Sequence, residues 1–210
     1  QQYRQIPHLL ELLKQPTLGD LSLVNQVFWS LIEHLYDACQ SSRSSNDDVP
    51  AAETLRRWTL TQLETAITEY DRIAMPERVV EGILILGEPT HPAVKKALWN
   101  GPPVCRELAS HILFESRHPG VLQQIAASLS LAYPHPKVME AIGQRSDPEL
   151  IGALLRACDG RVTGQQQKNL RQIRALPWLD VSPDLLESIP PVLQPALVRF
   201  IAATQLSGNV

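Results

Sequence analysis

Six histidines are the side chains of this sequence best suited to proton transfer or metal binding. His111, Glu115 and His118 have the spacing with which one helix could present two ring nitrogens and a carboxylate to a metal ion. His118 precedes Pro119, however, and a proline at this place starts a new helix, which removes the shared face. Three histidines precede a proline and are expected to be half-exposed helix caps: His91, His118 and His135. We therefore expect no metal and no cofactor.

The sequence carries no motif of nucleophilic catalysis. There is no G-x-S-x-G, no glycine-rich phosphate loop and no H-E-x-x-H. Cys39, Cys105 and Cys158 are far apart and form no C-x-x-C pair, so they indicate neither a disulfide framework nor a zinc site. Cys105 and Cys158 lie within apolar stripes, which favours small core residues over reactive thiols. We expect that the protein is not an enzyme.

A basic stretch is the only concentrated charge of one sign. Positions 156 to 174 hold five basic residues against one acid, Asp159; the five are Arg156, Arg161, Lys168, Arg171 and Arg174. On the helix expected after Gly164, Lys168 and Arg171 lie opposite a buried stripe made of Leu170, Ile173 and Leu176. The stretch is either an ordinary solvated face or a contact patch for an acidic partner protein, and less readily for a phosphate backbone. A formal net charge of −3 argues against a chain built mainly to coat nucleic acid or anionic lipid.

Composition places the chain among ordinary folded proteins. It has 210 residues, 44% of them hydrophobic and 20% charged, enough for one or two domains with a core. No apolar stretch approaches the ~20 residues of a membrane span, and we expect a cytoplasmic protein without membrane contact. The chain starts with Gln1 and shows no targeting segment, so we expect a fragment of a longer polypeptide or a processed chain.

Apolar residues recur every three or four positions along nearly the whole chain, which predicts helices and no strand. A long helix is expected over 17–40, followed by a polar loop over 41–48 and a second helix that begins at Pro50. In that second helix the residues expected to be buried are Leu55, Trp58, Leu63, Ile67 and Tyr70. Another helix is expected from Pro76 to Gly87.

Beyond Pro76 a short pattern recurs: a proline, an aliphatic residue two positions later, a small or polar residue five later and an aliphatic residue six later. It occurs at Pro92, Pro119, Pro136, Pro148 and Pro183, and more loosely at Pro195. Proline at the first helical position fixes φ and lacks an N–H that would be unpaired there. The residues before the first five prolines are expected to be N-caps: His91, His118, His135, Asp147 and Ser182. The five aliphatic residues two positions after the prolines are expected to be buried: Val94, Val121, Val138, Leu150 and Leu185.

This pattern resembles the short HEAT-like repeats of bacterial proteins and covers about 76–201. The resemblance implies an all-α fold, a right-handed α-solenoid of antiparallel HEAT-like helix pairs over 73–210 behind an N-terminal helical cap over 1–72, in one continuous unit. It also implies a non-enzymatic scaffold that binds another protein or another domain of the parent chain, with no small-molecule substrate. An ordinary bundle of proline-started helices is the alternative fold.

Other HEAT-like proteins suggest further functions. A nucleic-acid-binding or DNA-repair module would use the basic stretch 156–174, and Trp178 with Asp180 resembles the aromatic and acidic base pocket of HEAT-like DNA glycosylases. The iron-dependent hydroxylases built on such repeats use His-Glu pairs, and no His-Glu dipeptide occurs here. A lyase or chaperone for a pigment protein is supported only by the fold of such lyases.

Overall fold

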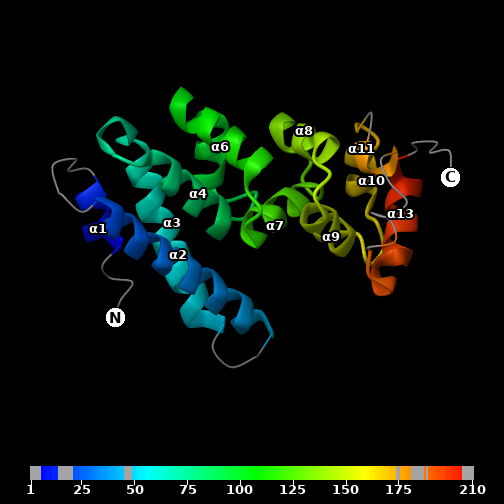
Figure 1. Cartoon of the computed structure of the whole chain (residues 1–210), viewed down its shortest axis with the longest axis horizontal. Coiled ribbons are helices and arrows are strands. Elements are labelled where there is room, and N and C mark those ends of the chain that lie inside the picture. The colour runs from blue at the N-terminus through cyan, green and yellow to red at the C-terminus, as the bar shows by residue number, and fades with distance from the viewer. Residues whose placement is uncertain are drawn as a thin grey trace. The chain divides into compact units, whose positions relative to one another are not determined.

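The computed structural model describes residues 6–13, 21–44, 49–173, 176–180, 187 and 189–204 (Figure 1). Every regular element within these ranges is helical, which confirms the predicted all-α class for them. The elements are α1 (Ile6–Leu13), α2 (Leu21–Ser44), α3 (Val49–Ile67), η2 (Tyr70–Arg72), α4 (Pro76–Leu86), α5 (Pro92–Lys95), the π-helix η3 (Lys96–Asn100), α6 (Pro103–Glu115), α7 (Pro119–Ser128), α8 (Pro136–Gln144), α9 (Pro148–Ala157), α10 (Gly164–Leu170), α11 (Pro177–Asp180), η4 (Pro191–Leu193) and α13 (Gln194–Thr204). None of the described helices is long and apolar enough to cross a bilayer.

The chain divides into two compact units, Gln1–Ala109 and Ser110–Val210, called the first and second unit below. The boundary falls inside α6. The expected division into a cap over 1–72 and repeats over 73–210 is based on where the repeated pattern begins. The two compact units are defined by contacts and do not test that division. It stays a prediction, as does the solenoid.

In the first unit, α2, α3 and α4 pack on one another, and α2 and α3 lie side by side (Figure 1). The predicted polar loop over 41–48 is wrong at its start, because α2 continues to Ser44; a helix already formed propagates through polar residues. The rest of that loop lies outside the described residues. The stripe expected on α3 is partly wrong: Leu63 and Ile67 are buried, whereas Leu55, Trp58 and Tyr70 are only half-buried. The buried face instead runs through Arg56, Thr59 and Leu60.

Proline starts the helices where the sequence predicted it. Pro92, Pro119, Pro136 and Pro148 are the first residues of α5, α7, α8 and α9. The aliphatic residues two positions later are all buried: Val94, Val121, Val138 and Leu150. Pro183, its cap Ser182 and Leu185 lie outside the described residues. Pro195 is the second residue of α13, whose buried positions are Ala196, Phe200 and Ala203.

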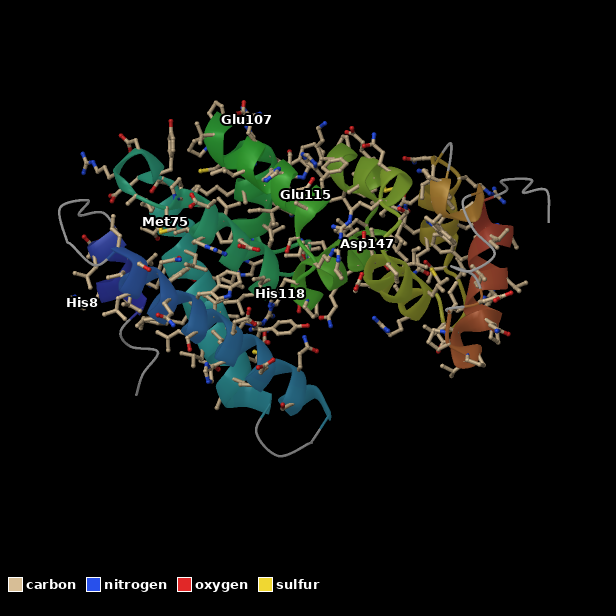
Figure 2. The ribbon with its side chains drawn as sticks, in the orientation of Figure 1. His8, Met75, Glu107, Glu115, His118 and Asp147 are labelled. Atoms are coloured by element: carbon tan, nitrogen blue, oxygen red, sulfur yellow. The ribbon has the colours of Figure 1, made fainter. Side chains whose placement is uncertain are left out.

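The predicted N-caps before the four described prolines are confirmed. The Nδ1 atoms of His91, His118 and His135 accept a hydrogen bond from the backbone N–H two residues later, at 3.2, 3.0 and 3.2 Å. Asp147 accepts one from the N–H of Leu150 at 3.1 Å. Figure 2 labels His118 and Asp147 at these helix starts. A histidine that accepts through Nδ1 must be neutral, because both ring nitrogens of the cation are donors.

A buried arginine satisfies the C-terminal end of α4. Arg56 on α3 donates from Nη1 to the carbonyl oxygen of Leu86 at 2.6 Å and binds the carboxylate of Glu53 through Nε and Nη2. Its Nη2 also lies 3.1 Å from Glu88. The next residue, Gly87, is extended, and a Cβ there would collide with Cγ2 of Val94 and the oxygen of Ile83. Helix α4 therefore ends at a glycine, and Arg56 from α3 donates a hydrogen bond to the last carbonyl of α4, which has no partner within the helix.

In the second unit, side chains likewise donate hydrogen bonds to carbonyl oxygens at the ends of three helices, α6, α7 and α9. Arg145, which is 8% exposed, donates from Nη1 to the oxygen of Leu113 at 2.7 Å and binds Asp147 through two nitrogens at 2.8 and 2.9 Å. The buried amide of Asn169 donates to the oxygens of Leu129 and Leu131 after α7, both at 2.8 Å. At the end of α9, two side chains donate to three carbonyls: Gln166 to Ala157, and Arg199 to Cys158 and Asp159. Helices that are remote in sequence are thus joined through polar groups of the main chain.

Replacing Arg145 by methionine is expected to lower the free energy of unfolding by about 3–5 kcal/mol, because one partner of a buried ion pair is removed and the other stays. The Asp147 carboxylate and the Leu113 carbonyl would both lose their donor. Chemical denaturation followed by circular dichroism measures the change. The matched control is Lys137→Met, since Lys137 pairs with Glu140 on the surface of the same unit and should change stability little. Equal changes in the two variants would contradict the structural role of Arg145.

The histidine cap of α5 is expected to make stability depend on pH. Burial, and then the charge of Arg56, lower the pKa of His91, while Glu64 and Glu88 oppose this. The stability from this cap is therefore complete above the ordinary pKa of 6.5 and is lost as pH falls through that value to the lowered pKa of the folded state. We expect the wild type to lose about 1 kcal/mol more than His91→Asn between pH 7.5 and 5, because asparagine caps without titrating. Urea unfolding at both pH values measures this, and equal losses in both proteins would rule it out.

Candidate functional site

The basic stretch singled out in the sequence is exposed where the structure describes it. Arg156 lies in the last turn of α9, Arg161 in the connection to α10, and Lys168 and Arg171 at the end of α10. Arg174 lies outside the described residues. Leu170, Ile173 and Leu176 are buried as predicted. The prediction that they form a stripe on one helix is wrong, because α10 ends at Leu170 and the other two residues follow it.

Ion pairing separates the basic residues of the second unit into two groups. Lys137, Arg145 and Arg199 bind carboxylates. Five others form no ion pair with any described residue: Arg117, Arg156, Arg161, Lys168 and Arg171. Described carboxylates without an ion pair in this unit are fewer: Glu115, Glu149 and Glu187. Free positive charge therefore exceeds free negative charge among the described side chains of this unit.

A pocket of about 390 Å³ lies in the second unit between α7, α9 and the segment 189–193. Its apolar lining comes from packed helices and three prolines: Leu122, Ile151, Ala153, Leu155, Ile189, Leu193, Pro119, Pro148 and Pro190. Its polar lining residues are Arg117, Gln123, Glu149 and Arg156. The volume is within the range of about 300–1,000 Å³ that is typical of ligand pockets. Two of the five unpaired basic side chains thus line an apolar pocket.

Gly152 shapes one wall of this pocket. It lies inside α9, one turn before Arg156, and a Cβ built on it would be 3.5 Å from Nη1 of Arg156 and 3.6 Å from Nη2. A side chain on a helix points back toward the N-terminus, so Arg156 extends over position 152. The glycine leaves space for this guanidinium at the pocket wall. The sequence analysis predicted neither the pocket nor a role for Arg117. The one local feature in the sequence that could have indicated the pocket is Gly152, a glycine within an otherwise regular helix.

The histidines that could have formed a metal site are not brought together by one helix face. His111 and Glu115 are exposed on α6, whereas His118 caps α7 with its Nδ1. Among the residues that the structure describes, no three His, Cys, Asp or Glu side chains form a group able to hold a metal ion.

Trp178 does not line an open base pocket. The side chain is 0% exposed and packs against Phe200 with ring centroids 5.8 Å apart. Stacking a nucleobase on this ring would require the end of the second unit to open. The side chain of Asp180 lies outside the described residues.

All three cysteines are free and buried, as expected of core residues. Burial raises the pKa of the Cys105 thiol, and burial raises the pKa of Cys158 to about 11 in spite of the nearby Arg199. The sulfur of Cys39 lies 3.7 Å from the oxygen of Ala52. The reactive thiolate form is therefore disfavoured at two of the three positions.

We expect the native thiols to react with Ellman's reagent at pH 8 about 100-fold more slowly than the unfolded ones, because both access and ionisation are reduced. The reaction in guanidinium chloride should release three equivalents, one for each of Cys39, Cys105 and Cys158. Fast reaction of one equivalent in the native protein would identify an accessible thiol and contradict this expectation.

Comparison with known proteins gives no relative. No family model matches the chain, and neither a curated protein nor a solved structure matches it. The resemblance to HEAT-like repeats therefore rests on the proline-started helices and their buried aliphatic residues, and it stays a prediction.

Proposed function

We propose that the chain is a non-enzymatic interaction module whose second unit binds an acidic surface, on another protein or on another domain of a parent chain. The observation that carries the proposal is the set of exposed basic side chains that form no ion pair with any described residue: Arg156, Arg161, Lys168 and Arg171. Four such charges within a short stretch would attract an acidic partner over the screening length of about 8–10 Å at physiological ionic strength.

The scaffold proposed for this surface is a right-handed α-solenoid of HEAT-like helix pairs, with residues 1–72 as a cap. Support comes from four helices that repeat one local design: a cap, a proline, and buried aliphatic residues two and six positions later. Solenoids expose extended surfaces formed by successive helices, and they generally use them to bind macromolecules. The free cysteines suit a reducing compartment, so we place the protein in the cytoplasm.

A protein partner is favoured over nucleic acid for two reasons. The chain as a whole has a net charge of −3, so a long polyanion would be repelled outside the basic stretch. Trp178, the aromatic residue of the supposed base pocket, is fully buried. A third function, as a lyase or chaperone for a pigment protein, has no support from a particular side chain.

The proposed surface is tested by reversing two charges, Lys168→Glu with Arg171→Glu. A partner captured from the native source with the wild-type protein is identified, purified and titrated back by calorimetry. We expect the double variant to weaken binding by at least about tenfold at 50 mM salt, and the effect to shrink as salt increases. Circular dichroism and melting temperature should be unchanged, because both side chains are exposed.

The matched control is Arg72→Glu with Lys95→Glu, which changes the net charge equally at two exposed positions of the first unit. Binding should be retained in this control. Unchanged binding in the test variant would reduce the basic stretch to a solvated face. Salt-sensitive binding of a DNA duplex that the test variant abolishes would replace the protein partner with nucleic acid.

A further inference from the structure

We propose that the pocket between α7, α9 and the segment 189–193 is a docking site for an acidic peptide segment of the partner, one that places a large apolar side chain next to a carboxylate. This inference rests on the proposed function, because it specifies the chemistry of the same partner. It assigns the apolar side chain to the pocket interior and the carboxylate to the pocket's two arginines.

The pocket interior fits an apolar anchor. Its volume of about 390 Å³ exceeds the roughly 150 Å³ of an apolar cavity that takes up benzene. The aliphatic side chains of the lining are at most 7% exposed, whereas the lining residues Pro119, Pro148 and Pro190 are exposed. One aromatic side chain, or two aliphatic ones, would cover the apolar surface that remains open to water at a gain of ~25 cal/mol per Å².

The charged groups around the pocket favour a carboxylate over an ammonium group. Arg117 and Arg156 line it against a single carboxylate, Glu149, and none of the three forms an ion pair with a described residue. A guanidinium binds a carboxylate through two parallel hydrogen bonds, which adds direction to the charge attraction.

The surroundings of the pocket favour an elongated ligand. Arg156 is both a pocket residue and the first residue of the basic stretch, which continues through Arg161 to Lys168 and Arg171. Val192, which is 73% exposed, lies between the pocket residues Pro190 and Leu193 in the chain. We expect a peptide anchored in the pocket to extend onto side chains of these two segments, which a small molecule confined to the pocket would not contact.

Gly152 offers a way to close the pocket without damaging the fold. A Cβ at this position makes only ordinary contacts with the flexible end of Arg156, and glycine is the weakest ordinary residue within a helix. A leucine here should fill the pocket, displace the Arg156 guanidinium and leave the melting temperature equal or higher. The variant Gly152→Leu therefore separates loss of the site from loss of the fold.

The probes are three fluorescein-labelled peptides of 12 residues, composed of leucine with glutamate, leucine with lysine, and serine with glutamate. Fluorescence anisotropy at 50 and 150 mM salt measures their binding to the whole chain. We expect micromolar binding of the leucine–glutamate peptide only, weakened about tenfold by Gly152→Leu because the anchor is excluded. Arg117→Gln with Arg156→Gln should weaken it similarly and flatten its salt dependence.

The control for an added leucine is Ala202→Leu, at an exposed position of α13 outside the pocket lining, and it should bind the peptide as the wild type does. Equal affinity of Gly152→Leu and wild type would overturn the inference, as would equal binding of the serine–glutamate peptide. Preference for dodecanoate, with no binding of the leucine–glutamate peptide, would assign the pocket to a small amphiphilic anion instead and also overturn it.

The two proposals fail in different ways. If the purified partner still binds Gly152→Leu but not the Lys168→Glu, Arg171→Glu variant, the pocket inference is wrong and the basic surface stands. If the partner binds both variants as it binds the wild type, the proposed function is wrong as well. Loss of partner binding in both variants supports the pocket as the anchoring part of one continuous surface.

Discussion

The satisfaction of helix ends is the constraint on which the rest of this structure depends. Most described helices have between 4 and 13 residues, so a large share of their backbone groups lies in a first or last turn without an intrahelical partner. At several helix ends a C-terminal carbonyl accepts a hydrogen bond from a side chain remote in sequence, and Arg56 and Arg145 donate such bonds while buried. Each guanidinium also binds a carboxylate, which balances the charge that it brings into the interior. Removing either arginine would therefore expose a carbonyl and a carboxylate together.

The N-terminal ends are solved locally, and this explains why the repeat is visible in the sequence. A proline has no N–H to satisfy, and the side chain before it accepts one of the remaining donors. The cap and the proline are adjacent in the chain, so each helix start can be recognised in the sequence as a dipeptide. Three of the four side-chain caps that precede a described proline are histidines, which accept this bond only while neutral. The described helix starts at Pro92, Pro119, Pro136 and Pro148 therefore share one local design.

The division between local and long-range interactions also decides what could be predicted. Proline starts, caps and aliphatic stripes follow from residues within one turn, and the structure confirms them for α5, α7, α8 and α9. The roles of Arg56, Arg145 and Asn169 depend on partners 30 to 40 residues away, so no local pattern marks them. The predicted buried face of α3 included only apolar residues, whereas the observed one includes Arg56, whose carbonyl partner Leu86 is 30 residues away. The pocket is likewise formed by three segments that are separate in the sequence, α7, α9 and 189–193, so no single sequence pattern predicts it.

Ion pairs within the fold determine which charged side chains remain free to bind a partner. In the second unit, Lys137, Arg145 and Arg199 form ion pairs with Glu140, Asp147 and Asp159. Arg156 and Arg117, which line the pocket, form no ion pair with a described residue, although the net charge of the chain is negative. Among the described side chains of this unit, ion pairs hold three of eight basic residues and three of six acidic ones, so more positive than negative charge remains unpaired. The pocket arginines proposed to bind a partner, Arg117 and Arg156, are ones that no described helix end or carboxylate engages.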